Sequence, residues 1–319
     1  MANGPLDGKR VVVALGGNAL GTTPQEQLKL LDGAAAHLTR MVKEGINVVI
    51  THGNGPQVGI IDEAFAAASK NPANQVPFMP LADCNAMSQG YIGAQLTCAL
   101  MNQFRAQDVM RNVADVPTHV VVDADDPAFK DLEKPIGAFM SEQEAKAFAK
   151  ATGCQVREDA GRGWRRVVAS PMPQDIVELD TIRNLVDDGC VAVAAGGGGV
   201  PVVMEDGAYR AVDAIIDKDL VSAILAWKMH ADALVILTAV DQVCVDFNKP
   251  TQKALAHLTA AEARTYMAQG QFAPGSMLPK VEACVKFVEA HPGGVAVITS
   301  LGHAVEGLRG KMGTLITAA

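Results

Sequence analysis

Short apolar runs alternate with amphipathic stretches along almost the whole chain, and this alternation restricts the fold more than any other feature of the sequence. The runs have the length of buried strands. In the stretches between them, apolar residues recur three or four positions apart, as on one face of a helix. Buried strands separated by helices are typical of a largely parallel sheet that is covered on both faces. The predicted strands are Val11–Leu15, Ile46–Thr51, Thr118–Val122, Val191–Ala195, Ala233–Thr238 and Val295–Thr299.

The amphipathic stretches predict the helices of this α/β fold. In the first of them, apolar residues recur from Leu28 to Val42, and Gly45 ends the pattern directly before the next strand. The other predicted helices are Asn85–Arg105, Pro173–Val186, Asp219–His230 and Leu278–Glu289. A chain of 319 residues is long enough to build either one large α/β domain or two smaller lobes from these elements.

Charge and composition argue against several classes of function. The net charge of −8 speaks against a general affinity for nucleic acids or for acidic membranes. No apolar segment reaches the length of a membrane span, and the first residues lack the pattern of a signal peptide. The six cysteines are scattered without a Cys-x-x-Cys pair, and the seven histidines form no metal-binding motif. We therefore expect a soluble, cytoplasmic protein with reduced thiols and no metal site of its own.

One region interrupts the alternation. From about residue 123 to residue 168 the chain is polar and rich in turns. It contains one short predicted helix, Ser141–Lys150, whose start carries the capping pair Ser141 and Glu144. We interpret the region as an insertion that forms a small subdomain, a flap over the functional site, because long structured insertions are usually functional. The alternative is a surface excursion without a role.

Three glycine-rich turns follow predicted strands: "LGGNAL" at 15–20, "THGNGPQVG" at 51–59 and "AAGGGGVP" at 195–201. Loops that leave the carboxyl ends of parallel strands meet in one crevice, where glycine lets backbone N–H groups approach an anion. Asn18 and Asn54 occupy positions suited to a helix cap or to a ligand contact. Each turn alone is weak evidence, but three turns of one kind favour an anionic ligand. The spacing in the second turn differs from the GxGxxG of a dinucleotide site.

Two lysines stand at predicted helix starts, where the positive end of the helix dipole disfavours a cation by up to about 1 kcal/mol. Asp217 is positioned to cap one helix, and Lys218 lies in its first turn. Ser276 precedes the second helix, and Lys280 lies in its first turn. Solvated lysines would explain either position alone. A bound polyphosphate would reverse the penalty at both, and Asp219 could then hold both ammonium groups in place.

The polar region supplies a third candidate lysine. Lys134 is followed by a stiff turn with a proline and a glycine, which could present the lysine to the crevice. Alone, Lys134 is more simply explained as an ordinary surface lysine. Three arginines follow in the same region, Arg162, Arg165 and Arg166. They could support the flap or bind an anion, although a hairpin turn explains them more simply.

Together these stretches resemble those of carbamate kinases, a group within the amino acid kinase family. The resemblance extends over nearly the whole chain and lies, in order, in "VVVALGGNAL", "THGNGPQVG", "KPIGAF", "EDAGRGWRRVV", "GGGGVPVV", "IIDKD", "ALVILTAVD" and "FAPGSMLPK". It implies a three-layer α/β/α sandwich with a mostly parallel central sheet and a small protruding subdomain. The chain would then be a single domain over residues 1–319, with the flap inserted at about 123–168.

The resemblance also implies an activity, the Mg²⁺-dependent transfer of a phosphoryl group between ATP and carbamate, with ADP and carbamoyl phosphate as the products. Such enzymes often run towards ATP synthesis at the end of arginine breakdown, and they are homodimers. The nucleotide phosphates, and not protein ligands, would carry the Mg²⁺. The N-terminal part would bind the substrate, and the part from about residue 190 to residue 319 would bind the nucleotide.

The same resemblance implies roles for individual residues. Lys218 and Lys280 would contact the transferred phosphoryl group and the nucleotide phosphates. Asp219 would organise both lysines, and Lys134 would reach the substrate from the subdomain. The oxygens of the phosphoryl group and of carbamate would be bound by Gly16, Gly17, Asn18, Gly53, Asn54, Gly55, Gly197 and Gly198. The nucleotide would be bound by Asp217, Thr238, Val240, Asp241 and Met277.

Three alternatives remain open. Another kinase of the same family, acting on acetylglutamate or glutamate, would need a site for a second carboxylate, and the sequence shows no clear one. A dinucleotide-dependent oxidoreductase would need the fingerprint glycine spacing with an acidic residue about twenty positions further on. A relative that binds nucleotide without catalysis would keep the fold, although the full set of lysines and aspartate argues against it.

Overall fold

The central sheet is mostly parallel, as the alternation predicts. The computed structural model describes the chain except residues 1–5, 17–19, 22, 160 and 162. Within the described residues this sheet has eight strands, in the order β15-β17-β16-β12-β1-β2-β9-β3. In that order they are His257–Thr259, Thr314–Thr317, Val295–Ser300, Ala233–Thr238, Arg10–Leu15, Asn47–His52, Val191–Ala194 and Val113–Val116. Neighbouring strands run parallel, except for β17 against β16.

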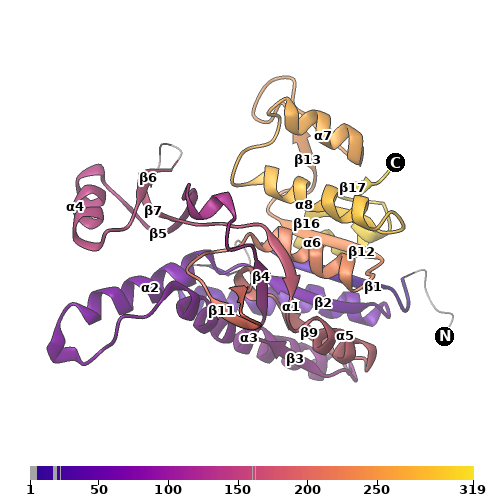
Figure 1. Cartoon of the computed structure of the whole chain (residues 1–319). Coiled ribbons are helices and arrows are strands. Elements are labelled where there is room, and N and C mark those ends of the chain that lie inside the picture. Colours follow the sequence, from indigo (N-terminus) through magenta and orange to yellow (C-terminus); the bar gives the residue numbers. More distant parts are fainter. Residues whose placement is uncertain (1–5, 17–19, 22, 160, 162) are drawn as a thin grey trace.

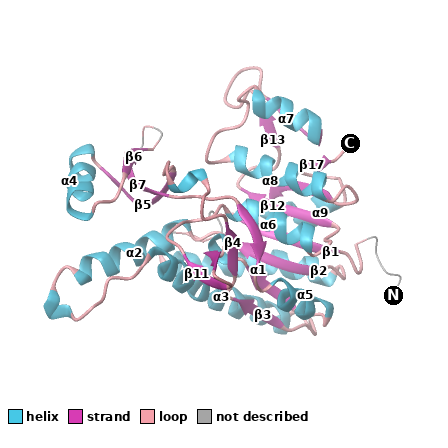
Figure 2. Cartoon of the chain, viewed as in Figure 1, coloured by secondary structure: helices cyan, strands magenta, loops and turns pink. Residues whose placement is uncertain are grey.

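Helices cover both faces of this sheet (Figures 1 and 2). One face carries α1 (Pro24–Lys43), α3 (Leu81–Ala106) and α9 (Ala304–Leu308). The opposite face carries α5 (Leu179–Asp187), α6 (Lys218–Lys228), α7 (Ala260–Ala268) and α8 (Met277–Ala290). Successive side chains of a strand point to opposite faces, so Val12 of β1 packs in one core cluster and Val13 in the other. The three-layer α/β/α sandwich is confirmed.

A second sheet corrects two sequence predictions. It has the order β11-β10-β4-β8, with the strands Ala208–Ala211, Val200–Glu205, His119–Val122 and Pro173–Ile176. The run predicted at Thr118–Val122 is therefore a strand outside the central sheet. The helix predicted at Pro173–Val186 is wrong at its start, because residues 173–176 form β8 and the helix begins only at Leu179. Burial of Pro173 and Ile176 in the pairing with β4 overrides the helical pattern there.

A third sheet lies within the region that interrupts the alternation. Its order is β5-β7-β6, with the strands Lys134–Met140, Trp164–Val168 and Val156–Glu158. Together with α4 (Glu142–Thr152) it projects from the rest of the molecule, above α2 (Gly55–Ser69) in Figure 1. The predicted capping box of Ser141 and Glu144 at the start of α4 is present. We call β5, β6, β7 and α4 the projecting subdomain.

The remaining elements are short. A two-stranded sheet joins β13 (Val243–Val245) to β14 (Lys253–Leu255). Single 3₁₀ turns lie at Pro72–Asn74, Pro127–Phe129, Gly196–Gly198 and Leu301–His303. Among the described residues no helix is both long and apolar enough to cross a membrane. All six cysteines are free thiols.

Candidate active site

The three glycine-rich turns lie at the carboxyl ends of three neighbouring strands. β1, β2 and β9 are adjacent and parallel in the central sheet, so the turns that follow them meet at one edge. The backbone N–H of Gly53 donates to the carbonyl of Leu15 over 3.3 Å, which joins the first two turns. A Cβ on Gly16 would lie 2.7 Å from the carbonyl oxygen of Leu237, at the end of the neighbouring β12. Gly17 and Asn18 lie outside the described residues.

The third turn fits between the other segments only because it is made of glycine. Gly197 has φ +64° and Gly198 has φ +88°, in the left-handed region that glycine adopts without strain. A Cβ on Gly197 would lie 2.1 Å from Nδ2 of Asn54, and one on Gly198 would lie 2.3 Å from the carbonyl oxygen of Ile216. The turn after β9 therefore touches both the second glycine turn and the residue before Asp217.

Asn54 has a different role from the helix cap that the sequence suggests. It precedes α2, which begins at Gly55, but its side chain makes no capping hydrogen bond. The buried amide instead donates to Oδ1 of Asn85 and to Oγ of Ser88, both on α3. Asn85 in turn donates to the carbonyl of Gly199 over 2.6 Å. This polar network holds the glycine turns against α3, and its α3 members were not predicted, although both interrupt an apolar helix face.

Asp217 caps α6, as predicted, and it also binds a lysine from the projecting subdomain. Its Oδ1 accepts from the backbone N–H of Asp219 at 2.9 Å, so the helix begins at Lys218. Its Oδ2 accepts from Nζ of Lys134, the first residue of β5, at 2.8 Å. Lys134 therefore lies at the start of α6, although it precedes Asp217 by 83 positions in the sequence.

Asp219 binds the two lysines that the sequence places at helix starts. Nζ of Lys218 lies 2.5 Å from its Oδ1, and Nζ of Lys280, in the first turn of α8, lies 2.9 Å from its Oδ2. The side chains of Lys218 and Lys280 are 12% and 16% exposed, and that of Asp219 is 4% exposed. Burial alone would raise the pKa of the Asp219 carboxyl group, but the two ammonium groups outweigh burial and lower its pKa to about 2.

The site carries an excess of positive charge in an acidic protein. Three ammonium groups, of Lys134, Lys218 and Lys280, face the two carboxylates of Asp217 and Asp219, which leaves one net positive charge. The first N–H groups of α6 add a partial positive charge at the same place. The chain as a whole has a net charge of −8, so this cluster is suited to an anionic ligand that the rest of the surface would repel.

His52, the last residue of β2, is a buried residue of the site that sequence reasoning missed. Burial, helped by the nearby charge of Lys218, lowers the pKa of its imidazole to about 4, although a hydrogen bond with the carbonyl of Gly53 opposes the shift. Its Nε2 is buried and has no hydrogen-bond partner among the described residues. A Cβ on Gly196 would lie 2.5 Å from this atom. A neutral imidazole therefore packs beneath the third glycine turn.

Apart from Asp217, the residues predicted to bind a nucleotide lie at the ends of β12 and α8, on the side of β1 away from β2. Thr238 ends β12, and its Cα is 4.0 Å from a Cβ built on Gly16. Asp241 is exposed, and its Oδ1 lies 3.0 Å from Nδ1 of His303. Val240 is half-buried beside it. Met277 begins α8 and packs partly buried against the core, three positions before Lys280.

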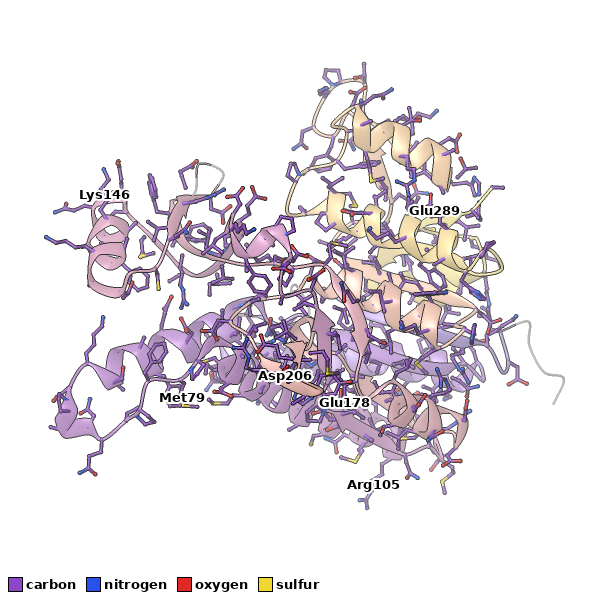
Figure 3. The ribbon with its side chains drawn as sticks, viewed as in Figure 1. Met79, Arg105, Lys146, Glu178, Asp206 and Glu289 are labelled. Carbon is purple, nitrogen blue, oxygen red and sulfur yellow. The ribbon has the colours of Figure 1, made fainter. Side chains whose placement is uncertain are left out.

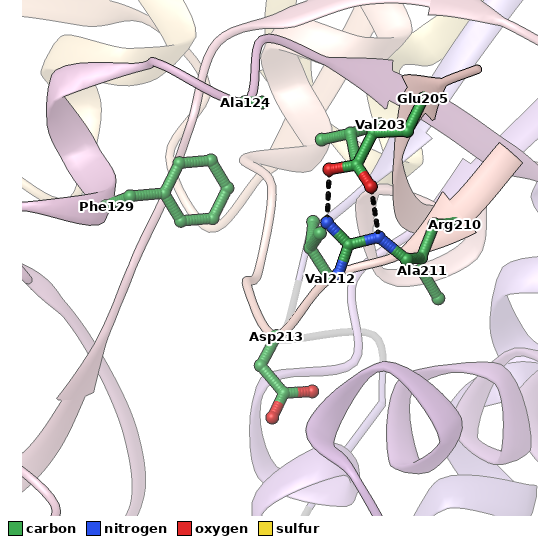
Figure 4. Close-up of a pocket in the computed structure, with 8 residues that line it drawn as sticks. All are labelled: Ala124, Phe129, Val203, Glu205, Arg210, Ala211, Val212 and Asp213. Carbon is green, nitrogen blue, oxygen red and sulfur yellow. Dashed lines mark hydrogen bonds and ion pairs between the residues drawn. The ribbon is translucent and has the colours of Figure 1, made fainter.

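A cavity of about 540 Å³ has a lining that includes none of the site residues described above (Figure 4). It is lined by the hairpin of β10 and β11, by Phe129 and by Asp213. Its one arginine, Arg210, is engaged by both carboxylate oxygens of Glu205, so its charge is neutralised. The lining of this cavity does not include Asp217 or Lys218. Because the cavity lacks the excess positive charge of the lysine cluster, we place the candidate site at the glycine turns and not in this cavity. Among the described residues no group of three His, Cys, Asp or Glu side chains could hold a metal ion.

Comparison with known proteins identifies relatives over nearly the full length. Residues 9–299 match the Amino acid kinase family. The carbamate kinase of Staphylococcus haemolyticus is 49% identical, over 96% of this chain and 99% of that protein. The carbamate kinase-like protein YqeA of Escherichia coli is 47% identical, over 97% of this chain and 99% of that protein. A solved carbamate kinase from Giardia lamblia bound to AMP-PNP superimposes with a TM-score of 0.89 at 42% identity, over 97% of this chain and 98% of that one. The chain belongs to the amino acid kinase family.

Proposed function

We propose that this chain is a carbamate kinase, which transfers a phosphoryl group reversibly between ATP and carbamate and forms ADP and carbamoyl phosphate. One observation carries the proposal: Asp219 holds the ammonium groups of Lys218 and Lys280 together at the edge where the glycine turns meet. The relatives of 47–49% identity that are named as carbamate kinase or carbamate kinase-like support the choice of carbamate as the acceptor.

The chemistry demands little covalent help from the protein. A carbamate oxygen attacks the γ-phosphorus of ATP, the bond to the β,γ-bridging oxygen breaks, and ADP leaves. Both reactants are anions, so they approach only when their charge is neutralised. Lys218, Lys280 and the N–H groups of the glycine turns would supply this stabilisation, and Asp219 would keep the lysines oriented. Carbamate is already ionised, so no general base is needed.

The remaining predicted residues divide between the two substrates. Lys134 would bind carbamate or the carbamoyl end of carbamoyl phosphate from the projecting subdomain, together with Gly16, Gly53, Asn54 and Gly55. In the C-terminal part, from about residue 190 to residue 319, Gly197 and Gly198 would bind phosphate oxygens. Asp217, Thr238, Val240, Asp241 and Met277 would line the nucleotide there. The chain would act as a single domain with the subdomain at about 123–168 as its flap. The contact between Gly16 and the end of β12 supports this division, because it brings a residue assigned to the carbamoyl substrate next to Thr238, which is assigned to the nucleotide.

Mg²⁺ belongs to this proposal as a companion of the nucleotide. When bound, it would supply positive charge that lowers the repulsion between the nucleotide phosphates and the incoming carbamate. The carboxylates of Asp217 and Asp219 are already occupied by lysines, so they fit a role in holding ammonium groups better than a metal cage. The phosphates would therefore carry the ion into the site. The motif resemblance further supports a cytoplasmic homodimer that makes ATP from carbamoyl phosphate at the end of arginine breakdown.

The decisive assay mixes the purified chain with Mg·ADP and carbamoyl phosphate and measures ATP with luciferase. A reaction without enzyme corrects for spontaneous breakdown of carbamoyl phosphate. Parallel reactions contain ATP with N-acetylglutamate or with glutamate, and hydroxylamine traps any acyl phosphate. We expect ATP to form from ADP and carbamoyl phosphate, and no acyl phosphate to form from N-acetylglutamate or glutamate. Acyl phosphate from either amino acid would overturn carbamate as the substrate, and nucleotide binding without any transfer would indicate a relative that lacks catalysis.

A further inference from the structure

The projecting subdomain rests on α2 through a close backbone contact. A Cβ on Gly59 of α2 would lie 2.6 Å from Cα of Gly137 in β5. Gly137 has φ +73°, so it adopts a conformation that other residues avoid. Beside this contact, Oε1 of Glu63 accepts from the backbone N–H of Ala138 at 2.8 Å. The strand that begins with Lys134 is therefore fitted to the surface of α2.

An ion pair crosses the same joint. Arg166 of β7 donates through Nη1 to Oδ2 of Asp62 on α2, and the two side chains are 18% and 6% exposed. Arg166 is paired in register with Ile136 of β5, two residues after Lys134. The pair thus ties the middle strand of the subdomain sheet to α2. Arg165, its neighbour, instead pairs with Asp159 within the subdomain and donates to the carbonyl of Gly137.

Two cavities flank this ion pair. One of about 340 Å³ lies between α2 and the subdomain, and one of about 290 Å³ lies towards the body of the molecule. Arg166 lines both of them. Buried apolar side chains at the joint form a small core cluster separate from the two main ones, made of Val58, Leu81, Cys84, Ile136, Val168 and Ile215. Because cavities lie on both sides of the ion pair, few other side chains restrain this part of the joint, and the directional contact between Asp62 and Arg166 helps to fix the angle of the subdomain.

α2 connects this joint directly to the glycine turns. It begins at Gly55, immediately after Asn54, whose side chain is fixed by α3. Lys134 and the second glycine turn are therefore held by the same helix. We propose that the Asp62–Arg166 ion pair is a positioning device, which sets the place of Lys134 above the start of α6 and thereby the affinity for the carbamoyl substrate. The inference rests on the proposed function for its substrate, but its geometry is independent of it.

The test neutralises the pair without leaving a buried charge. In the double variant Asp62→Asn with Arg166→Gln, neither charge is left unpaired and both side chains keep a hydrogen-bonding group, although Gln is shorter than Arg. The fold should therefore be retained, which circular dichroism and thermal melting check. We expect kcat/KM for carbamoyl phosphate to fall several-fold, by less than in Lys134→Ala, with the KM for ADP changed less than twofold. The matched control neutralises an exposed pair of the same region, Asp131→Asn with Arg157→Gln, and should leave both constants unchanged.

Two further measurements separate positioning from general damage. In a Lys134→Ala background the double substitution should lower kcat/KM by less than a further twofold, because the lysine that it positions is gone. Acetylation of Lys134, followed by mass spectrometry, should become several-fold faster in the double variant, since the contact with Asp217 is loosened. Arg166→Lys keeps the charge and should restore most of both signals.

The outcomes are distinguishable from those of the activity proposal. A chain that makes no ATP would refute carbamate kinase activity, yet the labelling of Lys134 would still report on the joint. Full additivity with Lys134→Ala, or unchanged labelling of Lys134 in a folded double variant, would overturn the positioning role.

Discussion

Lys280 and Lys134 each donate to an aspartate carboxylate, but one contact is buried in the body of the molecule and the other spans the joint to the subdomain. Lys280 reaches Asp219 from a helix that packs on the central sheet. Lys134 reaches Asp217 from a strand of the projecting sheet, and its side chain is 33% exposed. An ammonium–carboxylate pair is fixed only as firmly as the elements that carry it. The difference suggests a rigid charge cluster for the phosphates and a more adjustable contact for the smaller substrate.

Lys218→Ala should have the largest effect, because it removes a charge from the fixed cluster. We expect kcat to fall at least a hundredfold with the fold intact, since two ammonium groups would then face two carboxylates and the excess positive charge for the transferred phosphoryl group would be lost. Steady-state ATP synthesis and a thermal melt measure the two quantities. Lys228→Ala, at the other end of α6, is the matched control and should retain turnover. Near-normal turnover in Lys218→Ala would contradict the role of the buried lysine cluster in stabilising the transferred phosphoryl group.

Acidification should destabilise the body through His52. Its pKa is about 4 in the folded chain and about 6.5 when unfolded, so the unfolded state binds more protons between these values and stability falls as the pH drops through this window. The expected loss is about 2 kcal/mol between pH 7 and pH 5. Denaturant unfolding at both pH values measures it, and His52→Gln should reduce the loss by this amount. The exposed His257→Gln should behave like the unaltered chain, and a slope unchanged by His52→Gln would contradict the assignment.

Lys134→Ala should affect affinity more than turnover, in contrast to Lys218→Ala. We expect the KM for carbamoyl phosphate to rise about tenfold, equal to about 1.4 kcal/mol, with a smaller change in kcat. Lys146→Ala, at the outer end of the subdomain on α4, is the control (Figure 3). Initial rates at several carbamoyl phosphate concentrations give both constants. If kcat falls as far as it does in Lys218→Ala, the two regions contribute alike and the distinction fails.

Asp115→Asn should have the smallest effect of these variants, and its effect on stability should depend on pH in the opposite direction to that of His52. Asp115 lies on the edge strand β3, where burial raises the pKa of its carboxyl group to about 6. The folded state holds the proton better than the unfolded state, so this contribution to stability is lost as the pH rises from 3.8 through 6. At pH 8 the variant should be more stable by roughly 1 kcal/mol, because solvent screens the partly exposed group. At pH 3 the gain should vanish, and an equal gain at both pH values would contradict the cause.

The sequence was informative where local rules decide the structure. The Asp217 cap and the first turn of α6 follow from a few adjacent residues. The meeting of the glycine turns follows from the general behaviour of parallel strands. By contrast, α2 was not predicted, because glycine and proline at its start read as a loop. The side chain of Asn54 does not cap α2, because its amide donates to partners on α3, 31 and 34 positions away in the sequence. The joint of Asp62 with Arg166 spans 104 positions, and no local pattern indicates it.

The strand order has a consequence for how the chain is made. β1 pairs on one side with β2, which follows it closely, and on the other side with β12, which begins at Ala233. More than two thirds of this protein must therefore be synthesised before β1 can pair with β12, its second neighbour in the sheet. Throughout that time a bare row of N–H and C=O groups stands ready to pair with another nascent chain. Residues 10–15 are therefore the strand of the central sheet that waits longest for its second partner during synthesis.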